Sequence, residues 1–329
     1  MTEVDHRTDR KSLLHTLKSG NNPSNGREDV QIFEFFDFQR IIAATDNFSD
    51  MKIIGQGQLG PVYKGVLENG EEIAVKRVSR SAHNGNEQLK NELNLLARLK
   101  HKNLVKLMGF CIQWEQIILC FEFMPNSSLD QLLYGTRMLE VQLNWEQRFR
   151  LIQGISSGLL YLHEDTGDKI IHRDVKPANI LLNKNMVPKI SDFGISRLFV
   201  EDRTFFTTSN IAGTSGYMAP ELLQPGMLST KADVYSFGMV VLEIISGKRN
   251  TSCPPGLVSL RYGFVVDPTN KNGRRNDKPT QSLSAFVSKQ FKPLEWRHVI
   301  RVENTVKVAR ILVSCALIPP ANSIHAQST

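Results

Sequence analysis

Cysteine is scarce in this sequence and follows no metal-binding pattern. The 329 residues include four cysteines, Cys111, Cys120, Cys253 and Cys315, with no Cys-x-x-Cys spacing and no histidine partners. A disulfide framework and a zinc site are therefore excluded. We interpret the four cysteines as reduced thiols of a cytosolic protein.

Long apolar segments are missing too. A membrane-spanning helix needs about 20 apolar residues, whereas the best candidate, Val308–Ile318, is short and is interrupted by Arg310. The N-terminal sequence MTEVDHRTDR is charged and lacks the apolar core of a signal peptide. Thr2 excludes an N-myristoyl anchor. As written, the sequence predicts a cytoplasmic chain without a membrane span.

Excess charge of either sign is absent from most of the chain. Residues 1–250 hold 29 basic and 29 acidic residues. The net charge of +7 arises in residues 251–329, which hold 11 basic and 4 acidic residues. Because no uniformly basic surface is indicated, we expect no nucleic-acid partner.

Residue patterns divide the chain into five parts. Residues 1–30 are polar and predict a flexible arm. Residues 31–50 are rich in phenylalanine and predict a lead-in segment that packs on the following domain. Residues 51–124 are rich in β-strand patterns, and residues 125–250 are mainly helical. Residues 251–329 combine loop-forming residues with aperiodic apolar runs, which predicts a basic tail that is disordered or poorly ordered.

Individual elements can be placed within these parts. Apolar runs around an Asn-Gly turn predict strands between Met51 and Val78, and two more strands are expected over residues 105–110 and 116–122. Leucines at helical spacing predict a helix over residues 86–100. Further helices are expected over residues 128–134, 145–164 and 231–247.

Two motifs in the β-rich part fit phosphate binding. The glycines of Gly55-Gln-Gly57-Gln-Leu-Gly60 allow a tight turn whose backbone N–H groups can approach phosphate oxygens. A dinucleotide-binding turn shares this spacing but leads into a helix, whereas here a strand pattern follows. Lys76 lies sixteen residues before Glu92 and can bridge ATP phosphates and that carboxylate. Taken alone, an edge-strand lysine and a solvated glutamate would give the same pattern.

The most specific motif is Ile171-His-Arg-Asp-Val-Lys-Pro-Ala-Asn-Ile-Leu-Leu182. In it, Asp174 is placed to accept the proton of a substrate hydroxyl, and Asn179 offers a neutral oxygen to Mg²⁺. Lys176 can neutralise a γ-phosphate. Thirteen residues after Asn179, the carboxylate of Asp192 supplies a second metal ligand. The order and spacing of these groups predict a phosphoryl-transfer site.

With these motifs, the chain resembles plant receptor-like protein kinases of the cysteine-rich or S-domain receptor type. The likeness covers about residues 31–250, and it also rests on Phe36-Asp-Phe, Ile42-Ala-Ala-Thr-Asp-Asn-Phe48, Tyr63-Lys-Gly-Val, Met124-Pro-Asn-Ser-Ser-Leu-Asp130, Gly213-Thr-Ser-Gly-Tyr-Met-Ala-Pro-Glu221 and Asp233-Val-Tyr-Ser-Phe-Gly238. It implies a two-lobed α+β protein kinase fold, with a β-rich N-lobe over 51–124 and a helical C-lobe over 125–250. The implied activity is transfer of the ATP γ-phosphoryl group to Ser/Thr hydroxyls of proteins, with Mg²⁺. The alternative is a catalytically weak nucleotide-binding or scaffold protein.

The resemblance implies roles for individual residues. The implied catalytic residues are Asp174, Lys176, Asn179, Lys76 and Glu92, and the implied metal ligands are Asn179 and Asp192. The residues expected to contact ATP are Ile54, Gly55, Gln56, Gly57, Gln58, Leu59, Gly60, Pro61, Val62, Ala74, Lys76, Phe121, Glu122, Met124 and Leu181. Phe121 would be the gatekeeper before a hinge at Glu122–Met124. A spine of Leu96, Leu107, His172 and Phe193 would mark the active state, and Asp233 would anchor the catalytic loop.

Substrate choice and regulation are also implied. Lys176 favours Ser/Thr over Tyr acceptors, and Thr214 would line the acceptor site. Arg173, directly before Asp174, suggests control by phosphorylation of the activation loop, and the candidate sites are Thr204, Thr207, Thr208 and Ser209. The resemblance implies ATP, protein substrates with Ser/Thr acceptors, and upstream or receptor kinases as partners. Full-length members of the family are plasma-membrane receptors that carry this domain on the cytosolic side.

The sequence departs from the family pattern after Asn250. The family continues with about three further helices, which also supply an arginine that pairs with the acid equivalent to Glu221. Residues 251–329 match none of this, so we expect an incomplete C-lobe. Translated non-coding sequence and a genuine truncated isoform both explain the tail, and its proline-rich, aperiodic and basic character favours the first.

Overall fold

A computed structural model describes most of the chain between residues 33 and 266. The described residues are 33–57, 60–78, 92–93, 95–96, 98–113, 116–135, 143–199, 206–207, 211–223, 227–247, 249–250, 258–260 and 264–266. The chain divides into two compact units, Met1–Arg203 and Thr204–Thr329. The lobe boundary expected near residue 124 falls inside the first unit, and the expected flexible arm over residues 1–30 lies outside the described residues.

A six-stranded sheet forms the β-rich part of the first unit. Its strands run in the order β1-β5-β6-β4-β3-β2, and all neighbours are antiparallel except the pair β1 and β5. The strands are β1 (Glu34–Phe35), β2 (Ile53–Gly57), β3 (Gly60–Val66), β4 (Glu72–Val78), β5 (Leu107–Gln113) and β6 (Gln116–Glu122). The sequence predicted β2 to β6 but not β1, whose parallel pairing depends on contact with a strand more than 70 residues away.

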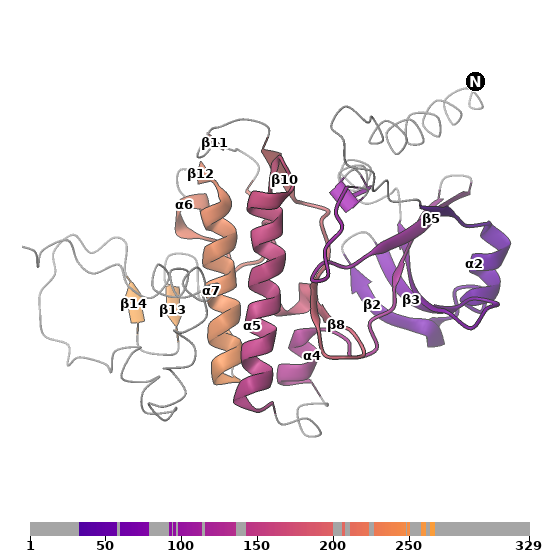
Figure 1. Cartoon of the computed structure of the whole chain (residues 1–329), viewed down its shortest axis with the longest axis horizontal. Helices are drawn as coiled ribbons and strands as arrows, with labels where there is room; N and C mark the ends of the chain where they lie inside the picture. Colours follow the sequence, from indigo (N-terminus) through magenta and orange to yellow (C-terminus); the bar gives the residue numbers. More distant parts are fainter. Residues whose placement is uncertain are drawn as a thin grey trace, which may run out of the picture. The chain divides into compact units, whose positions relative to one another are not determined.

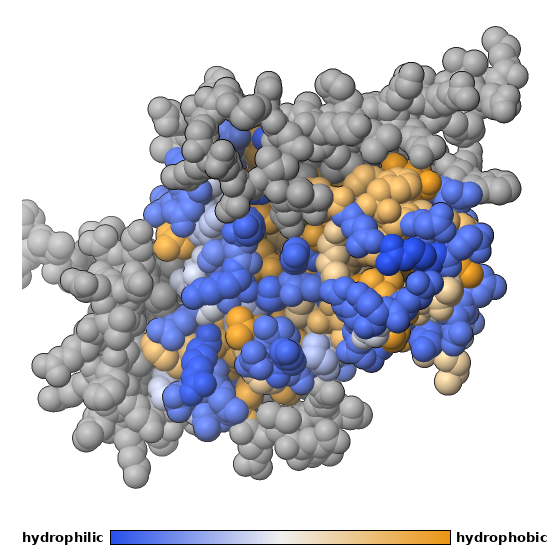
Figure 2. All heavy atoms as spheres, turned by 45° about the vertical axis from the view of Figure 1, so that its right-hand side comes forward, coloured by the Kyte–Doolittle hydropathy of each residue, from blue (hydrophilic) through white to orange (hydrophobic). Residues whose placement is uncertain are grey.

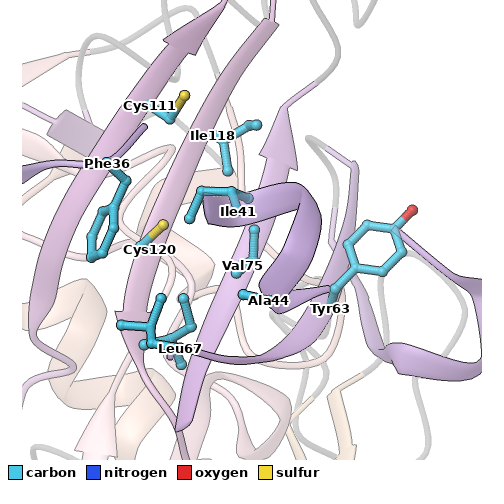
Figure 3. Close-up of a cluster of buried hydrophobic side chains, with 10 residues drawn as sticks. Phe36, Ile41, Ala44, Tyr63, Leu67, Val75, Cys111, Ile118 and Cys120 are labelled. Carbon is cyan, nitrogen blue, oxygen red and sulfur yellow. The ribbon is translucent and has the colours of Figure 1, made fainter. Parts of the chain in front are cut away.

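The lead-in segment packs on one face of this sheet. Helix α2 (Phe38–Ala44) begins at Asp37, whose side chain accepts a hydrogen bond from the backbone N–H of Gln39 at 2.8 Å. It places Ile41 and Ala44 against strand residues such as Val75 and Ile118 (Figure 3). The buried cluster consists of Phe36, Ile41, Ala44, Tyr63, Leu67, Ile73, Val75, Cys111, Ile118 and Cys120. Burial raises the pKa of the Cys111 thiol to about 11, so this cysteine acts as an apolar core residue.

The turn after α2 brings Phe48, the last aromatic residue of the segment, into the same packing. Asp46, Asn47 and Phe48 all have left-handed φ angles, of 53°, 56° and 54°. Non-glycine residues pay about 1–2 kcal/mol each in this region. Phe48 is thereby brought to Tyr63, with ring centroids 5.4 Å apart, and under the guanidinium of Arg77 at 4.9 Å. These aromatic and cation–π contacts offset the backbone strain.

The remainder of the first unit is mainly helical, with short strands (Figure 1). Its elements are α4 (Leu129–Tyr134), α5 (Trp145–Leu160), the π-helical turn η3 (Tyr161–Asp165), β7 (Lys169–Ile171), the 3-10 turn η4 (Pro177–Asn179), β8 (Ile180–Leu182), β9 (Pro188–Ile190) and β10 (Arg197–Phe199). Helix α5 starts with a reciprocal capping box between Asn144 and Gln147. Its Gly154 allows close approach of β9, because a Cβ there would lie 2.5 Å from Pro188 Cγ.

The second unit is built around one long helix. Helix α7 (Thr230–Ser246) begins at Ser229 and ends at Gly247, which has a left-handed φ of 65°. The shorter elements of this unit are β11 (Phe206–Thr207), α6 (Pro220–Leu223), β12 (Met227–Leu228), β13 (Val258–Leu260) and β14 (Phe264–Val266). Strands β13 and β14 pair antiparallel within the predicted tail.

Apolar side chains also reach the surface of the first unit. Phe35, Met51, Ile53, Ile54 and Val66 are between 41% and 92% exposed. Figure 2 shows one face of the molecule, on which hydrophilic and hydrophobic areas adjoin. Among the described residues, no helix combines the length and apolar character that crossing a membrane requires.

Candidate active site

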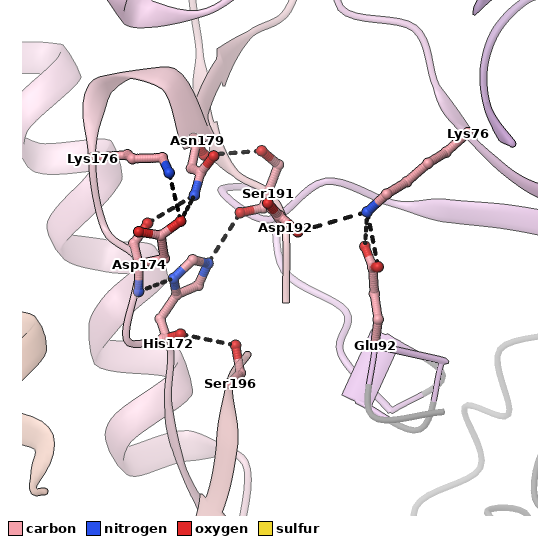
Figure 4. A network of polar contacts seen from close by, with 9 residues as sticks. All are labelled: Lys76, Glu92, His172, Asp174, Lys176, Asn179, Ser191, Asp192 and Ser196. Carbon is pink, nitrogen blue, oxygen red and sulfur yellow. Dashed lines mark hydrogen bonds and ion pairs between the residues drawn. The ribbon is translucent and has the colours of Figure 1, made fainter. Parts of the chain in front are cut away.

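Lys76 and Glu92 form a buried ion pair. The Lys76 ammonium donates to both carboxylate oxygens of Glu92, at 3.0 and 2.9 Å, and also lies 3.6 Å from Asp192 Oδ1 (Figure 4). Lys76 is 7% exposed and Glu92 1% exposed. Strand β4 therefore delivers one cation to two carboxylates that come from distant parts of the sequence, and the pairing agrees with the one that the motif spacing predicts.

Charge keeps Lys76 and Asp192 ionised despite their burial, whereas burial raises the pKa of Glu92. Burial alone would lower the pKa of the Lys76 ammonium, but the carboxylates of Glu92 and Asp192 outweigh it and raise that pKa. Burial would likewise raise the pKa of Asp192. The positive charges of Lys76 and Lys176, together with a hydrogen bond from the Gly194 backbone, hold it below its ordinary value. Near neutral pH, Asp192 is thus a carboxylate suited to bind a cation.

A second cluster surrounds Asp174. Lys176 Nζ lies 2.7 Å from Asp174 Oδ2, and the side-chain amide of Asn179 donates to the same oxygen at 2.9 Å and to the Asp174 carbonyl at 2.9 Å (Figure 4). Asp174 is 4% exposed. Since the Asn179 nitrogen points to Asp174, the amide oxygen is left for another ligand.

Backbone contacts join the two clusters. Ser191 donates to the Asn179 carbonyl through both its backbone N–H at 2.9 Å and its hydroxyl at 3.0 Å. The His172 ring is hydrogen-bonded to the Ser191 carbonyl at 3.0 Å and packs edge-on against Phe193. Asp192, which lies between these two residues, has a left-handed φ of 68°. Such strain at a rigidly held position is common in functional sites.

The glycine-rich hairpin lies over the lysine. Strands β2 and β3 pair Gly55 with Val62, Gln56 with Pro61 and Gly57 with Gly60. A Cβ at Gly57 would lie 3.8 Å from Lys76 Cε and 3.4 Å from the Gly60 carbonyl oxygen, so the backbone approaches the lysine side chain closely. Gln58 and Leu59, at the predicted tip, lie outside the described residues.

Several of the residues expected to contact ATP lie on strands β4, β6 and β8. Ala74 and Leu107 both pair with Phe121, and Leu181 forms an isolated bridge with Ser128. Ile54 on β2 has an exposed side chain, and Met124 is buried. These residues come from the elements that the resemblance assigns to a nucleotide pocket, and their contact with ATP stays a prediction.

Glu122 has a role that the sequence did not reveal. Its carboxylate pairs with Lys189 on β9 at 2.7 Å and accepts the backbone N–H of Lys106 at 2.8 Å. Lys189 also donates to the Leu104 carbonyl. The Glu122 Oε1 atom is therefore occupied by protein contacts, and the Glu122 backbone N–H donates to the Lys106 carbonyl at 3.1 Å. Lys189 lies 67 residues away, so no local motif signals this contact.

Ser128 and Ser191 are further residues near the site that motif reading missed. Ser128 lies beside the predicted ATP contact Leu181, and Ser191 connects the two charged clusters. The available signal for Ser191 was a small polar residue directly before the predicted metal ligand Asp192.

A cation would find oxygen ligands but not a preformed cluster of acids. No group of three or more His, Cys, Asp or Glu side chains in the described part of the chain could hold a metal. The Asn179 amide oxygen and the Asp192 carboxylate, on either side of Ser191, offer the hard oxygen donors that Mg²⁺ prefers. The donor set fits a cation that is shared with substrate phosphates.

The protein kinase domain family matches residues 48–259, which is more than half of the chain. The chain belongs to the protein kinase domain family. The matched region of this kinase domain begins later than residue 31 and ends nine residues beyond Asn250, so the likeness extends further into the tail than the sequence predicted. Membership in this family implies ATP and a divalent cation in general.

Curated relatives agree on the type of kinase. The G-type lectin S-receptor-like serine/threonine-protein kinase SRK of Arabidopsis thaliana is 50% identical over 234 residues, which is 71% of this chain and 27% of that protein. Cysteine-rich receptor-like protein kinase 5 of Arabidopsis thaliana is 52% identical over 217 residues, 66% of this chain and 33% of that protein. Cysteine-rich receptor-like protein kinase 37 of the same plant is 53% identical over 215 residues, 65% of this chain and 33% of that protein. This kinase chain thus spans about a third or less of the length of the relatives it matches.

Proposed function

We propose that this chain transfers the γ-phosphoryl group of ATP to serine and threonine hydroxyls of proteins, with Mg²⁺ as the cation. The observation that carries the proposal is the pair of charged clusters around Lys76 and Asp174. Ser191 ties them together through the Asn179 carbonyl. One cluster suits nucleotide phosphates and a cation, and the other suits a hydroxyl nucleophile.

The first cluster would hold the nucleotide. Lys76 would bind the α- and β-phosphates while Glu92 keeps its ammonium charged and directed. The Asn179 amide oxygen and Asp192 would hold Mg²⁺, which neutralises developing charge on the phosphates when bound. The glycine-rich backbone of β2 and β3 would cover the phosphates through its N–H groups.

The second cluster would act on the acceptor. The acceptor oxygen forms a bond to the γ-phosphorus, the bond from that phosphorus to the β–γ bridging oxygen breaks, and ADP leaves with the electron pair. Asp174 would accept the hydroxyl proton. Lys176, 2.7 Å from Asp174, would stabilise the negative charge on the transferred group. Most of the rate enhancement would come from positioning and charge.

Serine/threonine specificity is proposed on two grounds. Lys176 follows Asp174 by two residues in the pattern of such kinases, and one of the relatives, SRK, carries serine/threonine-protein kinase in its name. We further propose that receptor or upstream kinases regulate this chain through its activation segment. Of the candidate phosphosites, Thr204, Thr208 and Ser209 lie outside the described residues.

The test uses the purified full chain with ATP, Mg²⁺ and a generic protein acceptor. Asp174→Asn should reduce phosphoryl transfer by at least 100-fold, on the order expected for loss of a proton acceptor, while ATP binding stays nearly unchanged. The matched control is Asp165→Asn, an equal change at an exposed aspartate on the π-helical turn. ATP binding by a wild-type chain that transfers no phosphate would favour the scaffold alternative. Equal activity of Asp174→Asn and wild type would refute the mechanism.

A further inference from the structure

A buried acid in the second unit takes no part in the proposed chemistry. Glu243, on α7, is 1% exposed. Both its carboxylate oxygens lie 3.0 Å from the Tyr217 hydroxyl, and its Oε1 also accepts the backbone N–H of Asn250. Buried carboxylates require such partners, so Glu243 links Tyr217 to the chain that follows α7.

The end of α7 brings Asn250 to this acid. The backbone N–H of Gly247 donates to the Glu243 carbonyl at 2.8 Å, and its left-handed φ of 65° ends the helix. A non-glycine residue would be strained at this φ. The chain leaves the helix in a turn and returns to the Glu243 side chain within seven residues.

Asn250 then reaches the turn that precedes Tyr217. Its side-chain amide donates to the Gly216 carbonyl at 2.7 Å, and Ser236 of α7 donates to the Tyr217 carbonyl at 2.7 Å. Two consecutive carbonyls of one turn are thus held by side chains from α7 and from Asn250, four residues beyond its end. The turn itself is closed by a hydrogen bond from the Tyr217 N–H to the Thr214 carbonyl at 3.1 Å.

We propose that Asn250 is a positioning residue for the protein acceptor, acting through the turn Gly213–Tyr217. This inference rests on the proposed function and on the role that the resemblance to receptor-like kinases implies for Thr214 of that turn, which is to line the acceptor site. Asn250 joins Gly216 to Glu243 and so fixes the turn against α7. Its loss should weaken use of the acceptor and leave use of ATP unchanged.

The two contacts of Asn250 can be separated. Its backbone N–H reaches Glu243 whatever the side chain, whereas only the side-chain amide reaches Gly216. Asn250→Ala therefore removes the Gly216 contact alone. Asn250→Asp keeps the shape but places a carboxylate against the Gly216 carbonyl and near Glu243, where it repels both.

The kinetic test compares these variants with Asn185→Ala, a change at an exposed asparagine of the β8–β9 turn. With the full chain, Asn250→Ala should raise KM for an acceptor peptide about 3- to 10-fold, as expected for one hydrogen bond. Its KM for ATP should not change, and the control variant Asn185→Ala should keep both KM values of the wild type. Asn250→Asp should show a larger rise at pH 8 that shrinks relative to wild type toward pH 5.5, because the protonated carboxyl can donate to Gly216. A general structural defect would raise both KM values and lack this pH signature, and that result would overturn the proposal.

A second measurement is independent of catalysis. Amide hydrogen exchange over residues 213–217 should accelerate in Asn250→Ala but not in Asn185→Ala. If the wild-type chain transfers no phosphate, the proposed function and the acceptor role of Asn250 both fail, and exchange still reports whether Asn250 holds the turn. If the chain is active but neither exchange nor KM changes in Asn250→Ala, only this inference is wrong.

Discussion

The buried ion pair between Lys76 and Glu92 makes a quantitative prediction about stability and activity. Replacing either partner leaves an uncompensated charge in a site that is 7% exposed at Lys76 and 1% exposed at Glu92. Replacing both with apolar residues, as in the double variant Lys76→Met with Glu92→Leu, removes both charges of this pair. We therefore expect the double variant to be more stable than Lys76→Met alone, although all three variants lose activity.

The distances set the order of the losses. At an effective dielectric constant of about 20, two opposite charges attract by about 6 kcal/mol at the Lys76–Glu92 separation of 2.9 Å and by about 5 kcal/mol at the Lys76–Asp192 separation of 3.6 Å, before desolvation. Lys76→Met removes both attractions and leaves two carboxylates facing each other. Glu92→Leu leaves Lys76 with Asp192, which is partly exposed. Breaking a buried pair costs about 3–5 kcal/mol, and we expect Lys76→Met at the upper end and Glu92→Leu at or below the lower end.

Thermal unfolding and a kinase assay on the same preparations test this prediction. For domains of 150–250 residues, 1 kcal/mol shifts Tm by about 2–4 °C. Lys76→Met should thus lower Tm by about 10–20 °C, and the double variant should recover several degrees of that loss without recovering activity. Additive losses in the double variant would show that the pair is not coupled as the distances indicate. Activity in any of the three variants would contradict the role of Lys76 and Glu92 in the reaction.

Three other changes have expected outcomes. Phe48→Ala should lower the free energy of unfolding by about 2–3 kcal/mol in a denaturant titration, because it leaves the left-handed turn without its aromatic contacts. This cost is somewhat below the range for fully buried phenylalanines. A loss below about 0.5 kcal/mol would contradict the prediction. Gly109→Ala should cost about 1–3 kcal/mol and release β1, since its Cβ would lie 2.0 Å from the Glu34 carbonyl oxygen, and unchanged protection of β1 amides would disprove it. Burial and the nearby Lys102 lower the pKa of His101 below its ordinary value of 6.5. The neutral ring therefore contributes stability above that value, which is lost as pH falls through the lowered pKa. Tm should fall more between pH 7 and 5 in the wild type than in His101→Gln, and equal falls would refute the assignment.

Much of the fold could be predicted because its signals are local. The Asn-Gly turn and the apolar runs placed strands β2 to β6 nearly where they occur, and helical periodicity placed α5 and α7. The end of α5 was less accurate. The predicted helix runs to residue 164, whereas the α-helix ends at Leu160 and continues as a π-helical turn. Such a change of winding depends on tertiary packing, and periodicity does not report it.

The lead-in segment shows where local signals end. Its phenylalanines indicated a need for burial, but neither the parallel pairing of β1 with β5 nor the left-handed turn at residues 46–48 could be inferred. Both depend on a partner surface formed later in the sequence. The same holds for Gly109, whose missing Cβ makes room for the Glu34 carbonyl.

In the candidate site too, groups that lie close in the sequence could be predicted, and contacts between distant residues could not. The sequence brought Asp174, Lys176 and Asn179 together because they share one short motif, and the structure shows these three side chains in contact. The contacts that hold such groups in place were missed, because Glu122 and Lys189 lie 67 residues apart and Tyr217 and Glu243 lie 26 residues apart. Nothing in the local sequence distinguishes Glu122 or Glu243 from an ordinary surface glutamate.

Burial and partners distinguish these glutamates from one another, and they assign different physical roles to them. Glu92 keeps Lys76 charged, Glu122 connects β6 to β9, and Glu243 binds the turn that ends at Tyr217. Glu221, the acid for which the family supplies an arginine, is only half buried and makes no ion pair with any residue in the described part of the chain. Because Glu221 is only half buried, leaving it without an arginine partner costs less than it would for a fully buried acid. The contacts of Glu243 and Asn250 with Tyr217 and Gly216 involve no residue beyond 250, so they do not depend on the segment in which the sequence departs from the family.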